Sequence, residues 1–164
     1  MIGNFRRISD SELQALLSEP EKISDLLYPE DNEIDETVNL DIDKSWHMIH
    51  FLLAGDPWSG LQPYANAVCG GTELGDEDMG YGPARYLTPE EVAEVDAAIA
   101  KISADELWSR FDPDAADQAE IYPGSDWKTE ADDFKEYMCQ YYGELQKFYR
   151  TAAKNGDAML LYIN

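Results

Sequence analysis

The chain has 164 residues, 44% of them hydrophobic, which is enough for a core of its own, and we expect one domain spanning residues 1–164. Its 12 basic and 34 acidic residues give a net charge of −22, which opposes binding to nucleic acid or to an anionic membrane surface. The sequence has two cysteines, no signal peptide and no apolar run of membrane-spanning length, so we expect a cytoplasmic protein with reduced thiols.

The N-terminal residues predict a strand followed by a short helix. Residues 1–8 alternate loosely between apolar and polar side chains, as a half-buried strand does. Ser9 and Glu12 then have the spacing of a capping box, in which each side chain bonds to the backbone amide of the other residue. Leu13 begins the apolar stripe of this helix, and Pro20 prevents a long continuation.

Acidic side chains are concentrated between Asp10 and Asp43. This segment contains twelve carboxylates and one cation, Lys22, so it carries a charge of −11, half of the total. One interpretation is a solvated surface with no specific ligand. The other is a face that attracts a basic protein partner, in which case association should weaken as the salt concentration rises.

The central residues 40–55 predict a helix with almost no polar face. We expect Asp43 to cap this helix and Gly55 to end it. His47 and His50 lie three residues apart, so their side chains occupy adjoining faces of the helix and can point toward one cavity.

His47 and His50 are the candidate catalytic residues, because an imidazole titrates near neutral pH and can act as a general acid or base. The alternative is that both rings pack beside Trp46 with their nitrogens bonded to the backbone or to a carboxylate. Two histidines at this spacing lack the third ligand that a metal site needs, so we expect no metal and no cofactor.

Residues 80–87 form a glycine-rich stretch that we interpret as a turn. It presents Arg85 and Tyr86 directly before a further helix, and an arginine in this position can hold a carboxylate or a phosphate. The spacing matches no phosphate-binding loop, and in so acidic a chain Arg85 can instead pair with an internal carboxylate. Tyr122 belongs to an aromatic turn that could border the same cavity. The candidate ligand-binding residues are therefore Trp46, Arg85, Tyr86 and Tyr122.

Two further helix starts are predicted at Thr88 and Ser103, each with a glutamate three residues later, and we expect Pro113 to stop the second helix. The longest helix should cover residues 130–154, where apolar side chains recur every three or four residues. Residues 158–163 then form a short apolar run, which predicts a buried strand that can pair with the N-terminal strand. The predicted class is α+β: one helix-rich domain with a small sheet that includes the terminal strands.

Five segments together resemble the YfbM-like family of small bacterial proteins, which is classed as a domain of unknown function. They are Met1–Gly3, Leu40–Leu52, Gly82–Leu87, Ile121–Pro123 and Phe148–Tyr149. The resemblance spans the whole chain, and its most specific parts are the Trp-His helix and the Gly-Pro-Ala-Arg-Tyr stretch. It implies a single α+β domain, but it carries no catalytic role over to any residue of this sequence.

Two functions from different classes remain open at this point. The first is a non-enzymatic module that binds a basic protein, for example a toxin or a regulator that it neutralises, and the charge of −22 motivates it. The second is an enzyme or small-anion binder whose pocket gathers Trp46, both histidines, Arg85 and Tyr86. We favour the first, because no complete set of catalytic residues is visible. The sequence leaves the oligomeric state open.

Overall fold

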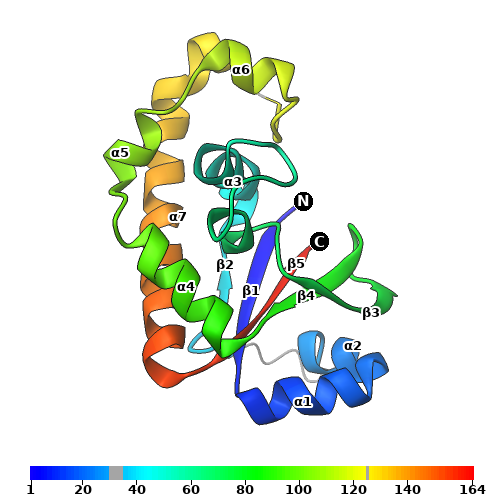
Figure 1. Ribbon diagram of the computed structural model, residues 1–164. Helices are drawn as coiled ribbons and strands as arrows, with labels where there is room; N and C mark the ends of the chain where they lie inside the picture. Colours follow the sequence, from blue (N-terminus) through cyan, green and yellow to red (C-terminus); the bar gives the residue numbers. More distant parts are fainter. Residues whose placement is uncertain (30–34, 125) are drawn as a thin grey trace.

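A five-stranded antiparallel sheet forms the centre of the computed structural model, which describes residues 1–29, 35–124 and 126–164 (Figure 1). The strand order is β2-β1-β5-β4-β3. The strands are β1 (Gly3–Ile8), β2 (Asn39–Asp41), β3 (Thr72–Asp78), β4 (Pro83–Leu87) and β5 (Ala158–Ile163). The two terminal strands pair directly, with Phe5 opposite Leu161, as predicted.

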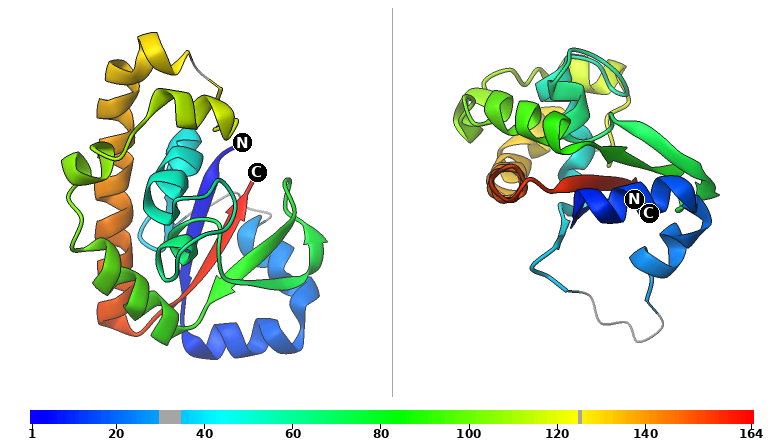
Figure 2. Two further views of the ribbon diagram at one scale, coloured as in Figure 1. Left: turned by 45° about the horizontal axis from the view of Figure 1, so that its top comes forward. Right: turned by 60° about the horizontal axis from the view of Figure 1, so that its bottom comes forward.

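Helices cover both faces of this sheet (Figures 1 and 2). The short helices α1 (Asp10–Ser18) and α2 (Ile23–Leu27) lie on one face, and α3 (Trp46–Ala54), α4 (Pro89–Ile99) and α7 (Trp127–Asn155) lie on the other. Two small helices, α5 (Ala104–Trp108) and α6 (Pro113–Gln118), connect α4 to α7. The antiparallel sheet with helices on both faces confirms the α+β class. Within the described residues, no helix is both long and apolar enough to cross a membrane.

The last strand is apolar throughout because both of its faces are buried. Met159 and Leu161 belong to the core beneath α3, α4 and α7, whereas Ala158 and Leu160 belong to the core beneath α1 and α2. Successive side chains of a strand point to opposite faces, so a central strand between two helical layers needs apolar residues at every position.

Most helix boundaries follow the predicted caps. Ser9 and Thr88 both form complete capping boxes, and the Ser103 hydroxyl accepts a hydrogen bond from the Glu106 amide. Gly55 and Gly156 end α3 and α7 in the left-handed conformation, with φ of 78° and 72°. These signals depend only on neighbouring residues, which is why the sequence reveals them.

Two local predictions were wrong. Asp43 does not cap α3: it has a φ of 46°, whereas a capping residue needs extended backbone, and a 3-10 turn (Asp43–Ser45) leads into the helix. Residues 80–87 are not simply a turn, since Arg85 and Tyr86 lie on β4, which pairs with β3 in a hairpin. Helix α5 ends at Trp108, before Pro113 as predicted, and Pro113 is in addition the first residue of α6, which Asp112 caps.

Two glycines provide a paired test of this packing. A Cβ at Gly3 would lie 2.6 Å from the Cβ of Trp46, so Gly3→Ala should lower the free energy of unfolding by about 1–3 kcal/mol. Gly143 lies within α7, and a Cβ added there would have no neighbouring atom within 4 Å. Gly143→Ala should therefore raise the free energy of unfolding by about 0.5–1 kcal/mol. Urea unfolding measures both changes. Equal effects of the two substitutions would contradict the packing at Gly3.

Candidate functional site

His47 is buried, with 1% of its surface exposed, and both of its ring nitrogens are hydrogen-bonded. Its Nδ1 accepts a hydrogen bond from the Tyr122 amide at 2.9 Å, so the ring proton must lie on Nε2, which donates to the Pro57 carbonyl at 2.9 Å. Burial lowers the pKa of His47, so the ring is neutral at pH 7. This histidine joins α3 to two separate loops.

His50 is fully buried, and its Nε2 donates to the Ser59 carbonyl at 3.0 Å. Burial lowers its pKa to about 4; His47 adds a smaller lowering, and the Ser59 carbonyl and Asp56 oppose it. Its Nδ1 has no hydrogen-bond partner among the described residues. The two histidines therefore bond to the carbonyls immediately before and after Trp58, and so they position the loop that carries this tryptophan.

The other candidates from the sequence are distributed over different parts of the fold. Trp46 is fully buried and stacks on His47, with ring centroids 4.6 Å apart. The Tyr122 hydroxyl accepts a hydrogen bond from the amino group of Met1 at 3.1 Å. Tyr86 packs against the core on the α1 and α2 face of the sheet. Of the candidate residues, only Arg85 lines the hollow described next.

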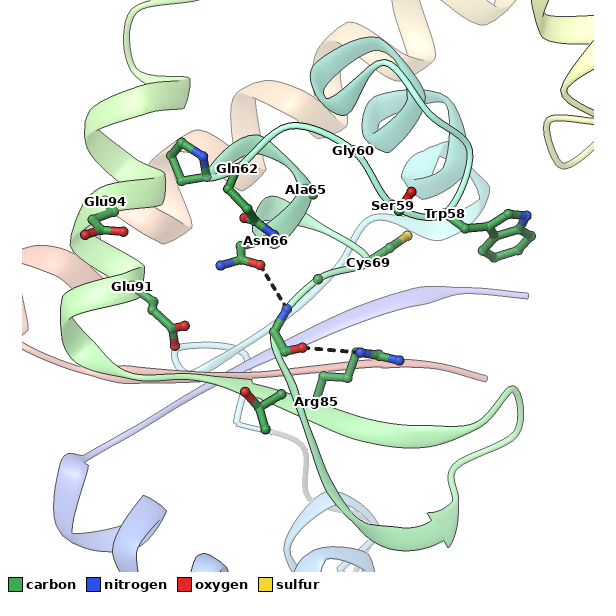
Figure 3. Close-up of a pocket in the computed structure, with 14 residues that line it drawn as sticks. Trp58, Ser59, Gly60, Gln62, Ala65, Asn66, Cys69, Arg85, Glu91 and Glu94 are labelled. Atoms are coloured by element: carbon green, nitrogen blue, oxygen red, sulfur yellow. Dashed lines mark hydrogen bonds between the residues drawn. The ribbon is translucent and has the colours of Figure 1, made fainter.

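A hollow of about 750 Å³ lies between residues 58–72, β4 and the first turns of α4 (Figure 3). A second hollow of about 200 Å³ lies beside it toward β5 and Tyr81, and the two share Trp58, Cys69 and Arg85. We call the two hollows together the groove. The first has carboxylates and amides at one end, Glu91, Glu94, Gln62 and Asn66, with Trp58 at the opposite end (Figure 3).

The floor of the groove is held in place by α7. Tyr149 is fully buried, and its hydroxyl lies 3.2 Å from the Asn66 carbonyl and 3.1 Å from the Ala67 carbonyl. The side-chain oxygen of Asn66 in turn accepts a hydrogen bond from the Gly71 amide at 3.0 Å. Gly71 has a φ of 87°, and a Cβ there would lie 2.7 Å from the Tyr86 carbonyl oxygen, so the chain can enter β3 here only with glycine.

Arg85 enters the groove with its charge already compensated. Its Nη2 lies 2.7 Å from Oε1 of Glu73, and its Nη1 donates to the Gly71 carbonyl at 3.2 Å. Glu73 faces Arg85 across the β3–β4 hairpin. This is the internal carboxylate that the sequence offered as the alternative to an external anion.

Two of the carboxylates of α4, Glu91 and Glu94, line the groove and make fewer contacts than Arg85 does. Glu91 accepts a hydrogen bond from the Thr88 amide through Oε2 at 2.9 Å, as part of the capping box. In the part of the chain that the structure describes, Oε1 of Glu91 and the exposed carboxylate of Glu94 have no hydrogen bond or ion pair. This end of the groove is therefore negatively charged.

Large side chains are exposed at the other end of the groove. Trp58 is 60% exposed and Tyr81 is 62% exposed. Cys69 lies between them, and burial raises the pKa of its thiol to about 12, so the thiol is protonated at pH 7. Trp58 was missed in the sequence, although a bulky aromatic residue inside the polar turn 56–60 is a usable signal. Glu91 was missed because it already had a role as a capping residue.

A separate surface gathers carboxylates from two distant parts of the chain. Glu21, Asp76 and Glu77 line a hollow of about 150 Å³, and the Ser24 hydroxyl donates to Glu77 at 2.5 Å, so α2, where the exposed Asp25 follows Ser24, contacts β3. We call Glu21, Asp25, Asp76 and Glu77 the acidic face. The acidic segment predicted from the sequence contributes Glu21 and Asp25, whereas its residues 30–34 lie outside the described part of the chain.

The described ranges contain no group of three or more His, Cys, Asp or Glu side chains placed to bind a metal ion. The groove combines a negatively charged end with an exposed aromatic end, and the acidic face adds further negative charge.

Comparisons with known proteins agree with the resemblance seen in the sequence. The family model described as "Domain of unknown function (DUF1877)" matches residues 1–162. Protein YfbM of Escherichia coli (strain K12) is 30% identical over 131 residues, which cover 76% of this chain and 74% of that protein. The crystal structure of YfbM from Escherichia coli, titled a protein of unknown function, superimposes with a TM-score of 0.76 at 25% identity and covers 98% of each chain. The chain therefore belongs to the DUF1877 family, to which its sequence already pointed.

Proposed function

We propose that this protein is a non-enzymatic cytoplasmic module that binds a basic protein partner. The observation that carries the proposal is the acidic face, because it joins Glu21 and Asp25 to Asp76 and Glu77, which lie about 50 residues away in the sequence. Like charges held close together repel one another and destabilise the fold. An oppositely charged partner would reduce this repulsion.

The nearby cations compensate only part of this charge, since Lys22 lies close enough to Glu21 and Asp25 to interact with their charges but forms its ion pair with Glu19. Lys22 pairs with Glu19 at 2.6 Å, and Arg85 pairs with Glu73. The described residues show no ion pair to any of the four carboxylates of the acidic face. These carboxylates therefore remain available to steer a cationic protein toward the surface.

The groove offers aromatic side chains that could contact a partner, in addition to the charge of the acidic face. The exposed Trp58 and Tyr81 line the same hollow as Arg85, and Trp, Tyr and Arg are the residue types that most often carry the binding energy of protein interfaces. The edge strand β3 carries both Thr72, which lines the groove on the α4 side of the sheet, and Asp76, which belongs to the acidic face on the α1 and α2 side. A partner that binds along this edge can contact both surfaces.

The rival function, an enzyme or small-anion binder, receives less support from the same geometry. His47 has both ring nitrogens bonded, and both histidines are buried and neutral at pH 7. Arg85, the group that would hold an anion, is already paired with Glu73. One observation still favours this function: Arg85 lines a hollow whose volume suits a small molecule.

Charge reversal with a matched control tests the proposal. One variant carries Glu21→Lys, Asp76→Lys and Glu77→Lys; the control carries Asp117→Lys, Asp132→Lys and Glu136→Lys on exposed positions of α6 and α7. Each reversal adds two charges, so both variants carry −16 instead of −22. A decalysine peptide, measured by calorimetry, should bind the first variant about tenfold more weakly than the control.

The same three proteins can then serve as baits for basic proteins in a cell extract. Basic proteins that the native chain and the control retain, that the acidic-face variant loses, and that raised salt releases would support the proposal. Equal loss in both variants would mean that only total charge matters, and retention that ignores salt would remove the electrostatic argument.

A further inference from the structure

We propose that the groove binds an extended segment of the basic partner, with a lysine or arginine side chain at the Glu91–Glu94 end and an apolar side chain beside Trp58. This inference rests on the proposed function and specifies how the partner is recognised. The two ends of the groove differ in chemistry, so the bound segment should lie in one orientation.

The shape of the groove suits an extended chain. Its larger hollow has a volume of about 750 Å³ and continues into the smaller one past Trp58, Cys69 and Arg85. Figure 3 shows Glu91 and Glu94 at one end of the larger hollow and Trp58 at the other. A ligand that contacts both ends is therefore long and narrow, as a peptide segment is.

The α4 end selects a cation. Glu91 and Glu94 lie three residues apart and share one side of the helix, and both line the hollow. Glu94 is exposed, and one oxygen of Glu91 remains unused by the capping box, so two carboxylates are available to the same incoming group. The Gln62 side chain borders this end and offers further hydrogen bonds.

The other end selects an apolar group. Most residues that line the smaller hollow are apolar or aromatic, and its one charged residue, Arg85, is paired with Glu73; the others are Trp58, Val68, Cys69, Tyr81, Pro83, Leu161, Tyr162 and Ile163. The Cys69 thiol is protonated at pH 7 and behaves as a small apolar side chain. His47 and His50 hold the carbonyls on both sides of Trp58, so the indole is presented by a fixed loop and loses little conformational freedom on binding.

The same residues argue against an anionic occupant. A phosphate or carboxylate in the larger hollow would face Glu91 and Glu94, and it would have to displace Glu73 from Arg85. The exposed surfaces on β3 are also acidic, from Glu73 to Asp78. Charge complementarity therefore favours a cationic segment in the groove.

Peptides that differ only at the cationic position test the assignment. The probes are acetylated and amidated peptides with one lysine and one leucine separated by two, four or six Gly-Ser residues, together with partners in which norleucine replaces lysine. Titrations followed by amide and indole N–H signals in nuclear magnetic resonance report both the affinity and the place of binding. The native protein should prefer lysine to norleucine about fivefold for the best spacing, with shifts at the Trp58 indole and the Glu94 amide.

Two neighbouring glutamates provide the matched variants. Glu94→Gln should reduce the preference for lysine, because only Glu91 remains at this end, whereas Glu90→Gln, which removes the same charge from an exposed residue of α4 outside the groove, should leave it unchanged. Trp58→Ala should weaken both peptides alike, because it acts at the leucine end.

Each contrary outcome separates this inference from the proposed function. If both glutamine variants reduce the preference equally, the assignment of the groove is overturned. If no peptide binds in the groove while basic proteins still bind the acidic face, the inference fails and the proposed function stands. If an acidic peptide of the same length binds the groove more tightly than the lysine peptide, the proposal that the groove selects a cationic segment is wrong.

Discussion

Lowering the pH from 7 to 4.5 should reduce the free energy of unfolding by about 2.5 kcal/mol through His50 alone. The folded state holds the pKa of His50 at about 4, against its ordinary value of 6.5, because burial disfavours the charged ring. Below pH 6.5 the unfolded chain takes up a proton that the folded chain refuses until about pH 4. The stability is therefore complete above pH 6.5 and is lost progressively as the pH falls toward 4. Burial lowers the pKa of His47 as well, which adds loss in the same direction.

A glutamine at position 50 separates this effect from the titration of carboxylates. His50→Gln can still donate one hydrogen bond to the Ser59 carbonyl but cannot take up a proton. Urea unfolding at several pH values between 7.5 and 4.5 should give this variant a lower free energy of unfolding at pH 7.5 and a shallower decline below pH 6.5. Hydrogen bonds within their own turns lower the pKa values of Glu12 and Asp35 without any contribution from His50, so their effect cancels in the comparison. Parallel declines would show that His50 is not the source.

Trp46→Ala should lower the free energy of unfolding by about 3–5 kcal/mol, the range for removing a large buried side chain. The indole of Trp46 is fully buried, stacks on His47 and lies 6.0 Å from the Tyr122 ring. Its loss leaves a cavity between α3, β1 and the loop that holds Tyr122, because Gly3 contributes no side chain to fill it. Denaturant unfolding followed by circular dichroism measures the change.

The neighbouring tryptophan is the control for this substitution. Trp58 lies 5.9 Å from Trp46 but is 60% exposed, so Trp58→Ala should cost less than about 1.5 kcal/mol. Two tryptophans in contact thus differ in role, one stabilising the fold and the other presented to solvent. Equal losses of stability would show that Trp58 supports the fold as much as Trp46 does, and would weaken its assignment to a binding surface.

The histidines illustrate why the candidate site was only partly visible in the sequence. Their spacing correctly placed them on adjoining faces of α3, but the spacing carries no information on what those faces meet. In the structure they meet the carbonyls of Pro57 and Ser59, and the loop between them turns Trp58 outward. The two histidines thus support an exposed aromatic residue that the sequence did not single out.

The sequence by itself determined the family, the α+β class, the pairing of the terminal strands and most helix ends. These depend on patterns within one turn or one strand: the capping residues Ser9 and Thr88, the left-handed glycine Gly156, and the unbroken apolar run of β5. Only the tertiary structure decided that Arg85 lies on a strand paired with Glu73, and that Glu21 of the N-terminal segment meets Asp76 and Glu77 of β3. The groove and the acidic face arise from contacts between distant residues, and periodicity and capping describe only neighbours along the chain.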